Sequence, residues 1–495
     1  MATPKTLFQK ILISFSQMFS GNIIMSATSI ISSYFFALFL GPYLYGIWQT
    51  ALVILGYGVI IELGLPFIFR RDYVFLQHDG KMKEAQNMSN LLFTYSLIIR
   101  LISTVLIYIY AYVYIDNEHF RYSMYLISVL FIVGLPISFG NIMSKGLNQY
   151  GKITWQKSIN GLGLLITIPF VYLYGYNSLL IGFLFTNILV AVYYYLYRPV
   201  KFGFYWNFNL FKKMAFSAFP LFLVSIVSVI FISIDRLIIA SMLGYKQVGF
   251  YSLSRLLSNP LNITIGAISI VLFTRLNEAY GATINKSIIN KHVIIPQSFF
   301  SNLLPIMIGI GLLALPLLVK LLLPKYSDGI LAAQINIFAT YFYLMTSFSS
   351  NALFVANKQK YIALSFLFSG LVKVGLSILL IKGGYGITGV AFASVVAYLF
   401  YDVLMLKIIF NIIELPLKEY FKHIIKVLIP VLIPIVFIVV ATKLSRLNIH
   451  FSNHNPFVVL LEEILFIIAM FPFIRKLYLF VSKKIKNEKS IATIS

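Results

Sequence analysis

The segment LGPYLYGIW, at residues 40–48, is similar to LGYKQVGFY at residues 243–251, 203 positions later. Each segment follows a long apolar run that is expected to form a membrane-spanning helix. Further along the chain, five residues recur 209 positions later. The aligned pairs are Asn148 with Asn357, Ile153 with Ile362, Gly161 with Gly370, Gly175 with Gly384 and Tyr176 with Tyr385. An insertion of six residues between the two stretches accounts for the change of offset. The chain is therefore predicted to contain two copies of one helical bundle.

The composition places both copies in a membrane. Of 495 residues, 60% are hydrophobic and 11% are charged, whereas soluble domains are about 25% charged. A spanning helix needs about 20 apolar residues. Fourteen candidate helices cover residues 12–40, 44–69, 90–115, 122–146, 154–174, 177–197, 213–241, 246–274, 293–323, 329–355, 361–381, 385–410, 424–442 and 457–474. No stretch alternates with the period of two that is typical of barrel strands.

The predicted fold is an all-α polytopic membrane protein with two pseudo-symmetric six-helix lobes and a C-terminal helix pair. Residues 1–200 form the N-terminal lobe, residues 201–411 the C-terminal lobe, and residues 412–495 the last two helices with a basic cytoplasmic tail. Because each lobe has an even number of helices, both lobes face the same way across the membrane. Parallel repeats of this kind are typical of transporters that rock one half against the other.

The basic residues indicate the orientation of the chain in the membrane. With the N-terminus inside, 28 of the 39 Lys and Arg residues fall in cytoplasmic segments and 7 fall outside. This asymmetry is the one that orients membrane proteins, and it predicts that both termini are cytoplasmic. The net charge of +24 is then explained by membrane orientation and anionic lipid headgroups, and no nucleic-acid partner is expected.

Six charged residues fall deep inside the predicted helices, where a charge costs about 2.5–3.5 kcal/mol on insertion scales. The cations are Arg100, Arg236, Arg255 and Lys373, and the anions are Glu62 and Asp235. Salt bridges can account for part of this set, with Asp235 beside a neighbouring arginine and Glu62 beside Arg70 or Arg71. Three further carboxylates, at Asp402, Glu462 and Glu463, lie nearer helix ends, where they can snorkel or cap.

The four deep cations outnumber the two deep anions. This excess predicts a cavity for a ligand that carries about two negative charges, and a lipid diphosphate is such a ligand. Arginine binds phosphate oxygens bidentately and stays charged in a medium of low dielectric constant. Arg255, Lys373, Arg100 and Arg236 are therefore candidate residues of a cavity for the diphosphate and its glycan.

No motif for catalysis or metal binding is found. The chain has no cysteine, its six histidines are scattered, and GxSxG, Walker and HExxH motifs are missing. We therefore expect no enzyme activity, no metal and no cofactor. Without an ATP-binding loop, transport would draw on an ion gradient or on consumption of the product. Asp235 and Glu62 are candidates for ion coupling with H⁺ or Na⁺, or for salt bridges in the cavity.

Several segments together resemble a known family. They are the stretch from residue 40 to 46, IELGL at 61–65 with the arginines that follow, IDRLIIASMLG at 234–244 with VGFY at 248–251, and YGITGVA at 385–391. These segments look like the polysaccharide transporter family. That family belongs to the multidrug/oligosaccharidyl-lipid/polysaccharide exporter superfamily and includes the Wzx-type O-antigen flippases.

The resemblance implies a flippase of the bacterial inner membrane. Such a protein moves undecaprenyl-diphosphate-linked oligosaccharide, as for the O-antigen of lipopolysaccharide, from the cytoplasmic to the outer leaflet by alternating access. Its partners would be this substrate, membrane lipids and the polysaccharide polymerase machinery. Ion antiport often drives the cycle in the family. Asp235 lies within a segment that resembles a family motif. Arg255 and Lys373 are matched to cavity residues of the family only by the helix in which they lie and by their depth in it.

Three alternatives remain open. A lipid II flippase of the same superfamily carries several arginines in its first two helices, and the first helix here has none. A multidrug cation antiporter shares the fold but is expected to have twelve helices and an acidic cavity. A membrane glycan polymerase, the enzyme alternative, acts through large outer loops, whereas the longest outer connection predicted here, 443–456, is about fourteen residues.

Overall fold

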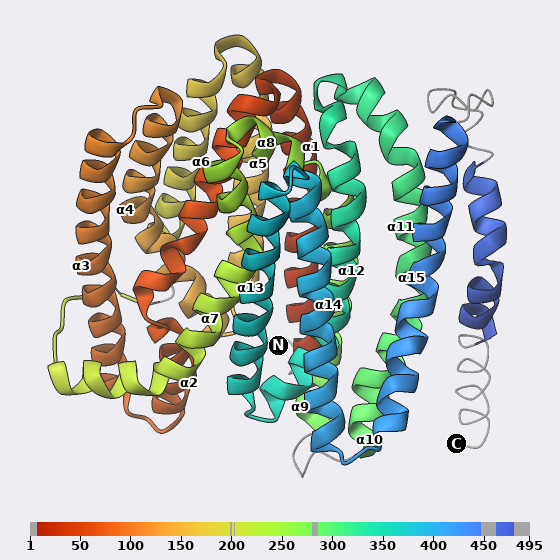
Figure 1. Cartoon of the computed structure of the whole chain (residues 1–495). Coiled ribbons are helices and arrows are strands. Elements are labelled where there is room, and N and C mark those ends of the chain that lie inside the picture. Colours follow the sequence, from red (N-terminus) through yellow and green to blue (C-terminus); the bar gives the residue numbers. More distant parts are fainter. Residues whose placement is uncertain (1–6, 199, 202, 280–285, 447–461, 480–495) are drawn as a thin grey trace. The chain divides into compact units, whose positions relative to one another are not determined.

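The computed structural model describes residues 7–198, 200–201, 203–279, 286–446 and 462–479, and within these ranges it contains helices and no strands (Figure 1). The chain divides into two compact units, Met1–Gly249 and Phe250–Ser495. The predicted all-α fold is confirmed. Eleven helices of the described residues are long and apolar enough to cross a membrane, so the predicted count of fourteen is approximate.

The elements of the first unit run from α1 to the start of α8. They are α1 (Leu7–Gly56), the 3₁₀ helix η1 (Tyr57–Glu62), α2 (Leu65–His78), α3 (Met82–Tyr114), α4 (Glu118–Gly146), α5 (Tyr150–Tyr174), α6 (Tyr176–Leu196), α7 (Phe208–Met242) and α8 (Tyr245–Tyr251).

The second unit contains the end of α8 and the elements that follow. They are α9 (Ser254–Ala279), α10 (Lys286–Ile289), the π-helical turn η2 (Asn290–Ile294), α11 (Ile295–Leu322), the 3₁₀ helix η3 (Pro324–Gly329), α12 (Ile330–Val355), α13 (Gln359–Lys382), α14 (Gly386–Ile412) and α15 (Leu417–Arg446). Residues 462–479 are also helical.

The first two predicted helices are joined in α1. The apolar stretch Ser16–Glu62 has 47 residues, which is enough for two spans of about 20 residues. Gly41 interrupts it with φ 69° and ψ 175°, a conformation that is essentially restricted to glycine. Pro42 follows, and proline both lacks an N–H and disfavours helical geometry in the residue before it. The predicted break therefore occurs as a kink.

Two predicted helices are interrupted in the structure. The expected helix 44–69 ends in η1, and Leu63 (φ 50°) and Gly64 (φ 70°) then take left-handed conformations before α2 begins. The expected helix 246–274 is divided into α8 and α9 by a turn at 252–253. Both predictions of a continuous helix were wrong, because hydropathy measures how apolar a stretch is and does not report its backbone dihedral angles.

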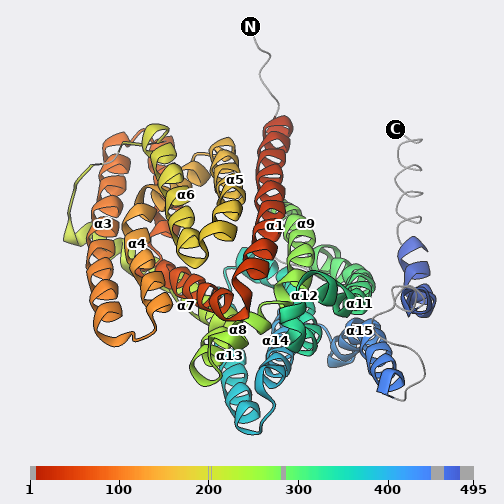
Figure 2. The ribbon, with the colours of Figure 1, turned by 90° about the horizontal axis from the view of Figure 1, so that it is seen from above.

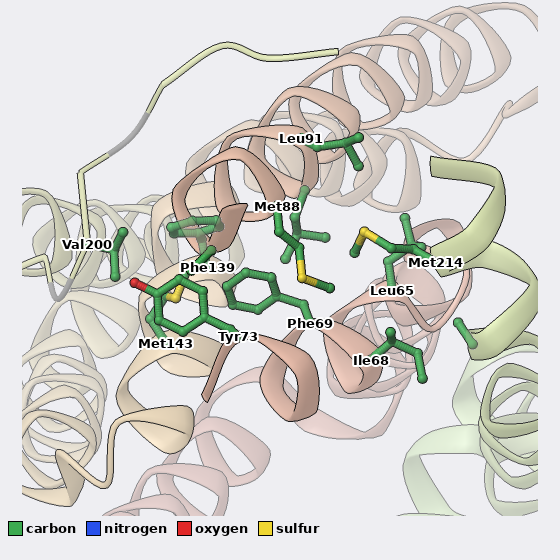
Figure 3. Packing of buried hydrophobic residues seen from close by; sticks show 13 residues of the cluster. Leu65, Ile68, Phe69, Tyr73, Met88, Leu91, Phe139, Met143, Val200 and Met214 are labelled. Atoms are coloured by element: carbon green, nitrogen blue, oxygen red, sulfur yellow. The ribbon is translucent and has the colours of Figure 1, made fainter. Parts of the chain in front are cut away.

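The core of the first unit is built around α2. Phe69 and Tyr73 of α2 pack against Met88 of α3, Phe139 of α4 and Met214 of α7, and all five side chains are buried (Figure 3). These contacts bring α7 into the core that α2, α3 and α4 form. The predicted lobes at 1–200, 201–411 and 412–495 remain a prediction, since the compact units divide the chain after residue 249.

Helices α5 and α6 approach closely through small residues (Figure 2). A Cβ added at Gly163 of α5 would lie 2.4 Å from Thr186 Oγ1 of α6, and one added at Gly182 of α6 would lie 2.4 Å from Thr167 Cγ2 of α5. Small residues that let backbones approach are the usual basis of helix packing in membranes, where lipid removes the hydrophobic driving force between helices.

The substitution Gly182→Ala is expected to destabilise the first unit by about 1–3 kcal/mol, because overpacking a tight contact costs that much. Gly375→Ala in α13 is the matched control, since its added Cβ would meet nothing within 4 Å. Thermal unfolding of the purified protein in detergent measures both variants. Equal melting temperatures for the two variants would contradict the packing assigned to α5 and α6.

In the second unit α14 is the central helix. It packs against α12, α13 and α15, and α12 also contacts α9 and α11. The helix at 462–479 contacts this unit through Phe466, whose ring would lie 1.9 Å from a Cβ added at Gly309 of α11. One face of α14 is therefore buried within this unit, whereas Phe392 and Phe400 on the same helix are exposed.

Candidate functional site

A buried ion pair joins Glu62 to Arg100 in the first unit. Arg100 Nη2 lies 2.5 Å from Glu62 Oε1, and the two side chains are 11% and 9% exposed. The same guanidinium donates to Ser138 Oγ at 2.9 Å and to the carbonyl oxygen of Phe131 at 2.8 Å. Gly134 of α4 leaves room for it, since a Cβ there would lie 3.0 Å from Arg100 Nη1. The pair is thus held by a network of hydrogen bonds.

The broken backbone between α1 and α2 places Glu62 in this pair. Glu62 is the last residue of η1, and the left-handed Leu63 and Gly64 follow it. A helix end leaves carbonyl groups without helical partners, and the hydroxyl of Tyr95 on α3 donates to the carbonyl oxygen of Ile61 at 2.8 Å. Helix α3 therefore supplies both the counter-ion of Glu62 and a donor for the backbone beside it.

The pairing of Glu62 corrects one expectation. Glu62 was expected to form a salt bridge with Arg70 or Arg71, whereas the structure pairs it with Arg100. Arg70 is exposed on α2, beyond the break at residues 63–64. The partner is set by the packing of α3 beside η1, which sequence spacing does not report. The charge of Arg100 is consequently balanced by Glu62 in the described structure. Arg100 therefore contributes less than predicted to the excess of buried cations over buried anions.

Asp235 and Arg236 lie next to each other on α7. The Asp235 side chain is buried, and its Oδ1 accepts a hydrogen bond from the backbone N–H of Arg236 at 2.9 Å. Two residues before Asp235, Ser233 Oγ donates to the hydroxyl oxygen of Tyr57 on η1 at 3.0 Å. Arg236 is half-buried. This part of α7 therefore forms a second polar site beside the broken segment that carries Glu62.

Lys373 is enclosed inside the second unit. It is 0% exposed, and its Nζ lies 5.2 Å from the centroid of the Tyr398 ring on α14. The buried residues Ser369 and Ser377 lie one turn before and one turn after it on α13. Their hydroxyl groups have no hydrogen-bond partner among the residues that the structure describes. A charge in this position faces protein and not acyl chains, and a ligand reaches it only after a rearrangement.

Arg255 is the second residue of α9 and is half-buried. The expectation that it lies deep inside one continuous helix was wrong, because the turn at 252–253 separates α8 from α9. The positive end of the helix dipole disfavours a cation in the first turn.

Asp402 is a third buried carboxyl group, which sequence reasoning assigned to a helix end. It is 3% exposed, and its Oδ1 has no hydrogen-bond partner in the described ranges. It lies in the interior of α14, close enough to Tyr341 of α12 and Tyr420 of α15 to interact electrostatically. The expectation that Asp402 snorkels or caps was wrong, because its side chain lies on the face of α14 that is buried within the second unit. Among the residues that the structure describes, Glu62, Asp235 and Asp402 are thus buried carboxyl groups that accompany the four candidate cations.

The candidate residues belong to different units. Arg100, Arg236, Asp235 and Glu62 lie in the first unit, and Arg255 and Lys373 lie in the second. The structure brings Glu62 together with Arg100, and Asp235 beside Arg236. A single cavity shared by residues of both units remains a prediction. Among the described residues, no group of three or more His, Cys, Asp or Glu side chains could hold a metal ion.

An apolar cavity of about 520 Å³ lies within the first unit, between parts of α1, α3, α4, α7 and α8. Hydroxyl groups of Thr50, Tyr110, Ser241 and Tyr245 are its polar lining, and no charged residue lines it. Burial raises the pKa of Tyr245 to about 12, and the nearby Tyr43 and Tyr110 add to this effect. The Tyr245 hydroxyl is therefore neutral at physiological pH. This cavity lacks the cations that a phosphate would need.

The long apolar helices define a multi-pass membrane protein. Residues 11–279 match the family described as polysaccharide biosynthesis protein, and the chain belongs to this family. The expected membership of the polysaccharide transporter family is thereby confirmed.

A curated relative is the "Putative O-antigen transporter" of Shigella flexneri, 24% identical over 346 residues, which cover 67% of this chain and 80% of the relative.

Solved structures with this fold include a lipid flippase and a multidrug resistance transporter. The lipid II flippase MurJ, in an inward closed conformation, matches with a TM-score of 0.68 and 16% identity over 95% of this chain and 99% of its own. An inward-facing multidrug resistance MATE family transporter of the MOP superfamily matches with a TM-score of 0.62 and 12% identity, over 79% of this chain and 99% of its own. At these identities the likeness shows the fold alone.

Proposed function

We propose that this protein is a flippase that moves undecaprenyl-diphosphate-linked oligosaccharide from the cytoplasmic to the outer leaflet of a bacterial inner membrane. It would work by alternating access, as a transporter and not as an enzyme, with both termini in the cytoplasm. The family membership and the O-antigen transporter among its relatives support a polysaccharide cargo. Membrane lipids and the polysaccharide polymerase machinery are its proposed partners.

The proposal that the cargo bears a diphosphate is supported by the set of cations buried in membrane-spanning helices. Lys373 is fully enclosed and Arg255 is half-buried, in one unit whose described buried carboxyl group is Asp402. A lipid-facing surface would not retain such charges, since each costs about 2.5–3.5 kcal/mol at the centre of a helix. We propose that Arg255 and Lys373 bind the diphosphate, with Arg236 and Arg100 as further candidate residues for the diphosphate and its glycan.

The pairing of Arg100 with Glu62 suggests how ion coupling would operate. A carboxylate that releases its arginine on binding H⁺ or Na⁺ would make a cation available to the substrate. Glu62 and Asp235 are the proposed coupling residues, and both lie on or beside the broken segment at η1. No resident cofactor is proposed.

Lipid II transport is the second candidate, because the flippase MurJ shares the fold over 95% of this chain. Both cargoes carry a diphosphate, so the buried cations suit either one. A multidrug cation antiporter is disfavoured by the positive charge of Arg255 and Lys373, since like charges repel.

Purified protein in proteoliposomes tests the proposed function. The cargo is a polyprenyl-diphosphate-linked oligosaccharide with a fluorescent label on the sugar, and a membrane-impermeant quencher reports the label in the outer leaflet. Active vesicles are expected to lose fluorescence from both leaflets, and protein-free vesicles from the outer leaflet alone. The same glycan on a polyprenyl monophosphate is expected to move at least about tenfold more slowly, for a loss of about 1.4 kcal/mol or more of phosphate recognition.

Three comparisons decide between the alternatives. Fluorescent lipid II in the same vesicles tests the second candidate, and a cationic dye tests multidrug antiport. A pH or Na⁺ gradient across the vesicles identifies the coupling ion. Equal transport of the monophosphate and diphosphate cargoes would contradict the diphosphate assignment, and no transport of either glycan lipid would contradict the flippase.

A further inference from the structure

The segment between α6 and α7 joins the two predicted copies and packs on α3. Gln86 Nε2 of α3 donates to the carbonyl oxygen of Lys201 at 3.2 Å, and the backbone N–H of Tyr205 donates to Thr94 Oγ1 of α3 at 3.1 Å. All of these residues belong to the first compact unit. The described part of the segment therefore has a fixed place along α3.

Helix α7 starts in a direction different from that of its neighbours. Its first turns lie across α3 and not along it (Figure 1). Asn207 caps the helix, since its Oδ1 accepts a hydrogen bond from the backbone N–H of Leu210 at 2.9 Å. Pro220 lies inside α7, and proline is a usual cause of a sharp kink in a helix. The residues that precede Pro220 therefore form a crosswise start to α7.

These first turns bury one face and expose the other. Met214 and Ala218, four residues apart, are buried in the core that α7 shares with α2, α3 and α4. Residues four apart lie on one face of a helix, and Phe208, Lys212 and Phe216 are exposed on the face opposite Met214. Phe208 is 64% exposed and Phe216 is 72% exposed. The first turns of α7 therefore present both large apolar and basic side chains outward.

Two more aromatic side chains extend this exposed face into the preceding segment. The ring centroid of Trp206 lies 5.3 Å from that of Phe211, in a stacked arrangement, and the ring centroid of Phe204 lies 5.9 Å from that of Phe93. Each ring is thus supported on one side while much of its surface stays exposed. Six exposed residues, here called the linker patch, are Phe204, Trp206, Phe208, Lys212, Lys213 and Phe216.

The linker patch suits the cytoplasmic surface of a membrane. The positive-inside orientation places the segment between α6 and α7 on the cytoplasmic side. Helices that lie in the plane of this surface present Phe and Trp to the lipid and Lys or Arg to the headgroups, and the negative potential of the cytoplasmic leaflet attracts such lysines. No acidic residue occurs in the sequence between Glu118 and Asp235, so this stretch itself offers Lys212 and Lys213 no counter-ion.

We propose that the linker patch binds the headgroups of anionic lipids in the cytoplasmic leaflet. Its four aromatic rings lie at the boundary between headgroups and acyl chains, and the ammonium groups of Lys212 and Lys213 contact lipid phosphate groups. The patch thereby holds the start of the second copy at the membrane surface. This proposal goes beyond the proposed function, because it concerns lipids of the bilayer and does not rest on the identity of the cargo.

Tryptophan fluorescence tests the proposal in the full-length protein. The chain has three tryptophans, so Trp48→Phe with Trp155→Phe leaves Trp206 as the one emitter. Vesicles contain phosphatidylcholine and phosphatidylglycerol in equal amounts, and bromine atoms are placed near the headgroup on one lipid or on the other. Brominated phosphatidylglycerol is expected to quench Trp206 at least about twofold more strongly than brominated phosphatidylcholine, because the lysines enrich anionic lipid beside it.

Two pairs of substitutions test the role of the lysines. Lys212→Gln with Lys213→Gln is expected to abolish the preference for brominated phosphatidylglycerol. Lys358→Gln with Lys360→Gln removes the same charge from exposed positions at the start of α13 and is expected to leave the preference unchanged. Equal quenching by the two brominated lipids in the protein with all its lysines would overturn the proposal. Quenching by neither lipid would overturn it too, and would show that water or a partner protein covers Trp206.

A second measurement leaves all tryptophans in place, because Trp48 is buried and its replacement can affect folding. The chain has no cysteine, so Phe216→Cys provides a single site for a bimane fluorophore. Lys83→Cys, at an exposed position near the start of α3, is the control. A lipid with a spin label at its headgroup is expected to quench the fluorophore at 216 several-fold more strongly than the one at 83. Equal quenching at the two positions would refute the contact between the linker patch and lipid.

Discussion

Lys373→Met is expected to lower the initial rate of transport of the diphosphate-linked glycan by at least about tenfold while the protein remains folded. Methionine has a similar length and no charge. Removing a fully buried cation is expected to be neutral or stabilising, because the desolvation cost of a buried charge is large. The lost interaction with the Tyr398 ring is worth about 2 kcal/mol when desolvated, which partly offsets this gain. A loss of transport would therefore reflect loss of the charge and not unfolding.

Two further variants test whether the loss of transport is specific to Lys373. Lys382→Met removes an exposed lysine at the end of the same helix and is expected to leave the rate unchanged. Arg255→Gln in the Lys373→Met background is expected to lower the rate further, because both cations are assigned to one ligand. The measurement is the quenching assay in proteoliposomes, with thermal unfolding as a check on folding. A Lys373→Met protein that transports at the wild-type rate would remove Lys373 from the proposed diphosphate site.

Glu62→Leu is expected to lower the free energy of unfolding by about 3–5 kcal/mol, the usual result of removing one partner of a buried ion pair. Arg100 would then be left charged among α3, α4 and η1, with Ser138 and the Phe131 carbonyl group as its remaining acceptors. Glu62→Gln is expected to cost less, since its amide oxygen still accepts a hydrogen bond from the guanidinium. Thermal unfolding in detergent gives the order of the three proteins.

The double variant Glu62→Leu with Arg100→Leu is the decisive control. Replacing both members of a buried pair by apolar residues is often neutral or stabilising, so the double variant is expected to recover most of the lost stability. Its transport activity separates two roles for the pair. Recovery of stability without recovery of transport would support a role in coupling, whereas recovery of both would show that the pair is structural. A double variant as unstable as Glu62→Leu would contradict the assigned pairing.

Much of the fold follows from hydropathy, because each long apolar stretch must form a helix in lipid. The predicted break between the first two helices is present at Gly41, where glycine and proline adjoin. The interruptions at 57–64 and 252–253 were missed, although Gly58, Gly64 and Pro66 mark the first of them. Such residues indicate where a helix can break, and the surrounding packing decides whether it does.

The candidate site could be predicted only in part. Sequence position gives the depth of Arg100 and Lys373 in their helices, and both are indeed withdrawn from solvent. It does not give the direction in which a side chain points around the helix axis, so the partner of Glu62 was assigned to Arg70 or Arg71 and the burial of Asp402 was missed. Both errors concern which residues of other helices lie beside a given side chain. These neighbours are set by contacts between helices that are far apart in the chain.

The placement of Lys373 has a consequence for biosynthesis. Inserting a helix with a lysine near its middle into the bilayer costs free energy. The Tyr398 ring that faces this lysine belongs to the next helix to be synthesised. The turn between α13 and α14 is only three residues long, at 383–385. We therefore expect the translocation channel to release α13 and α14 together as a helical hairpin, with the ammonium group already covered when it first meets lipid.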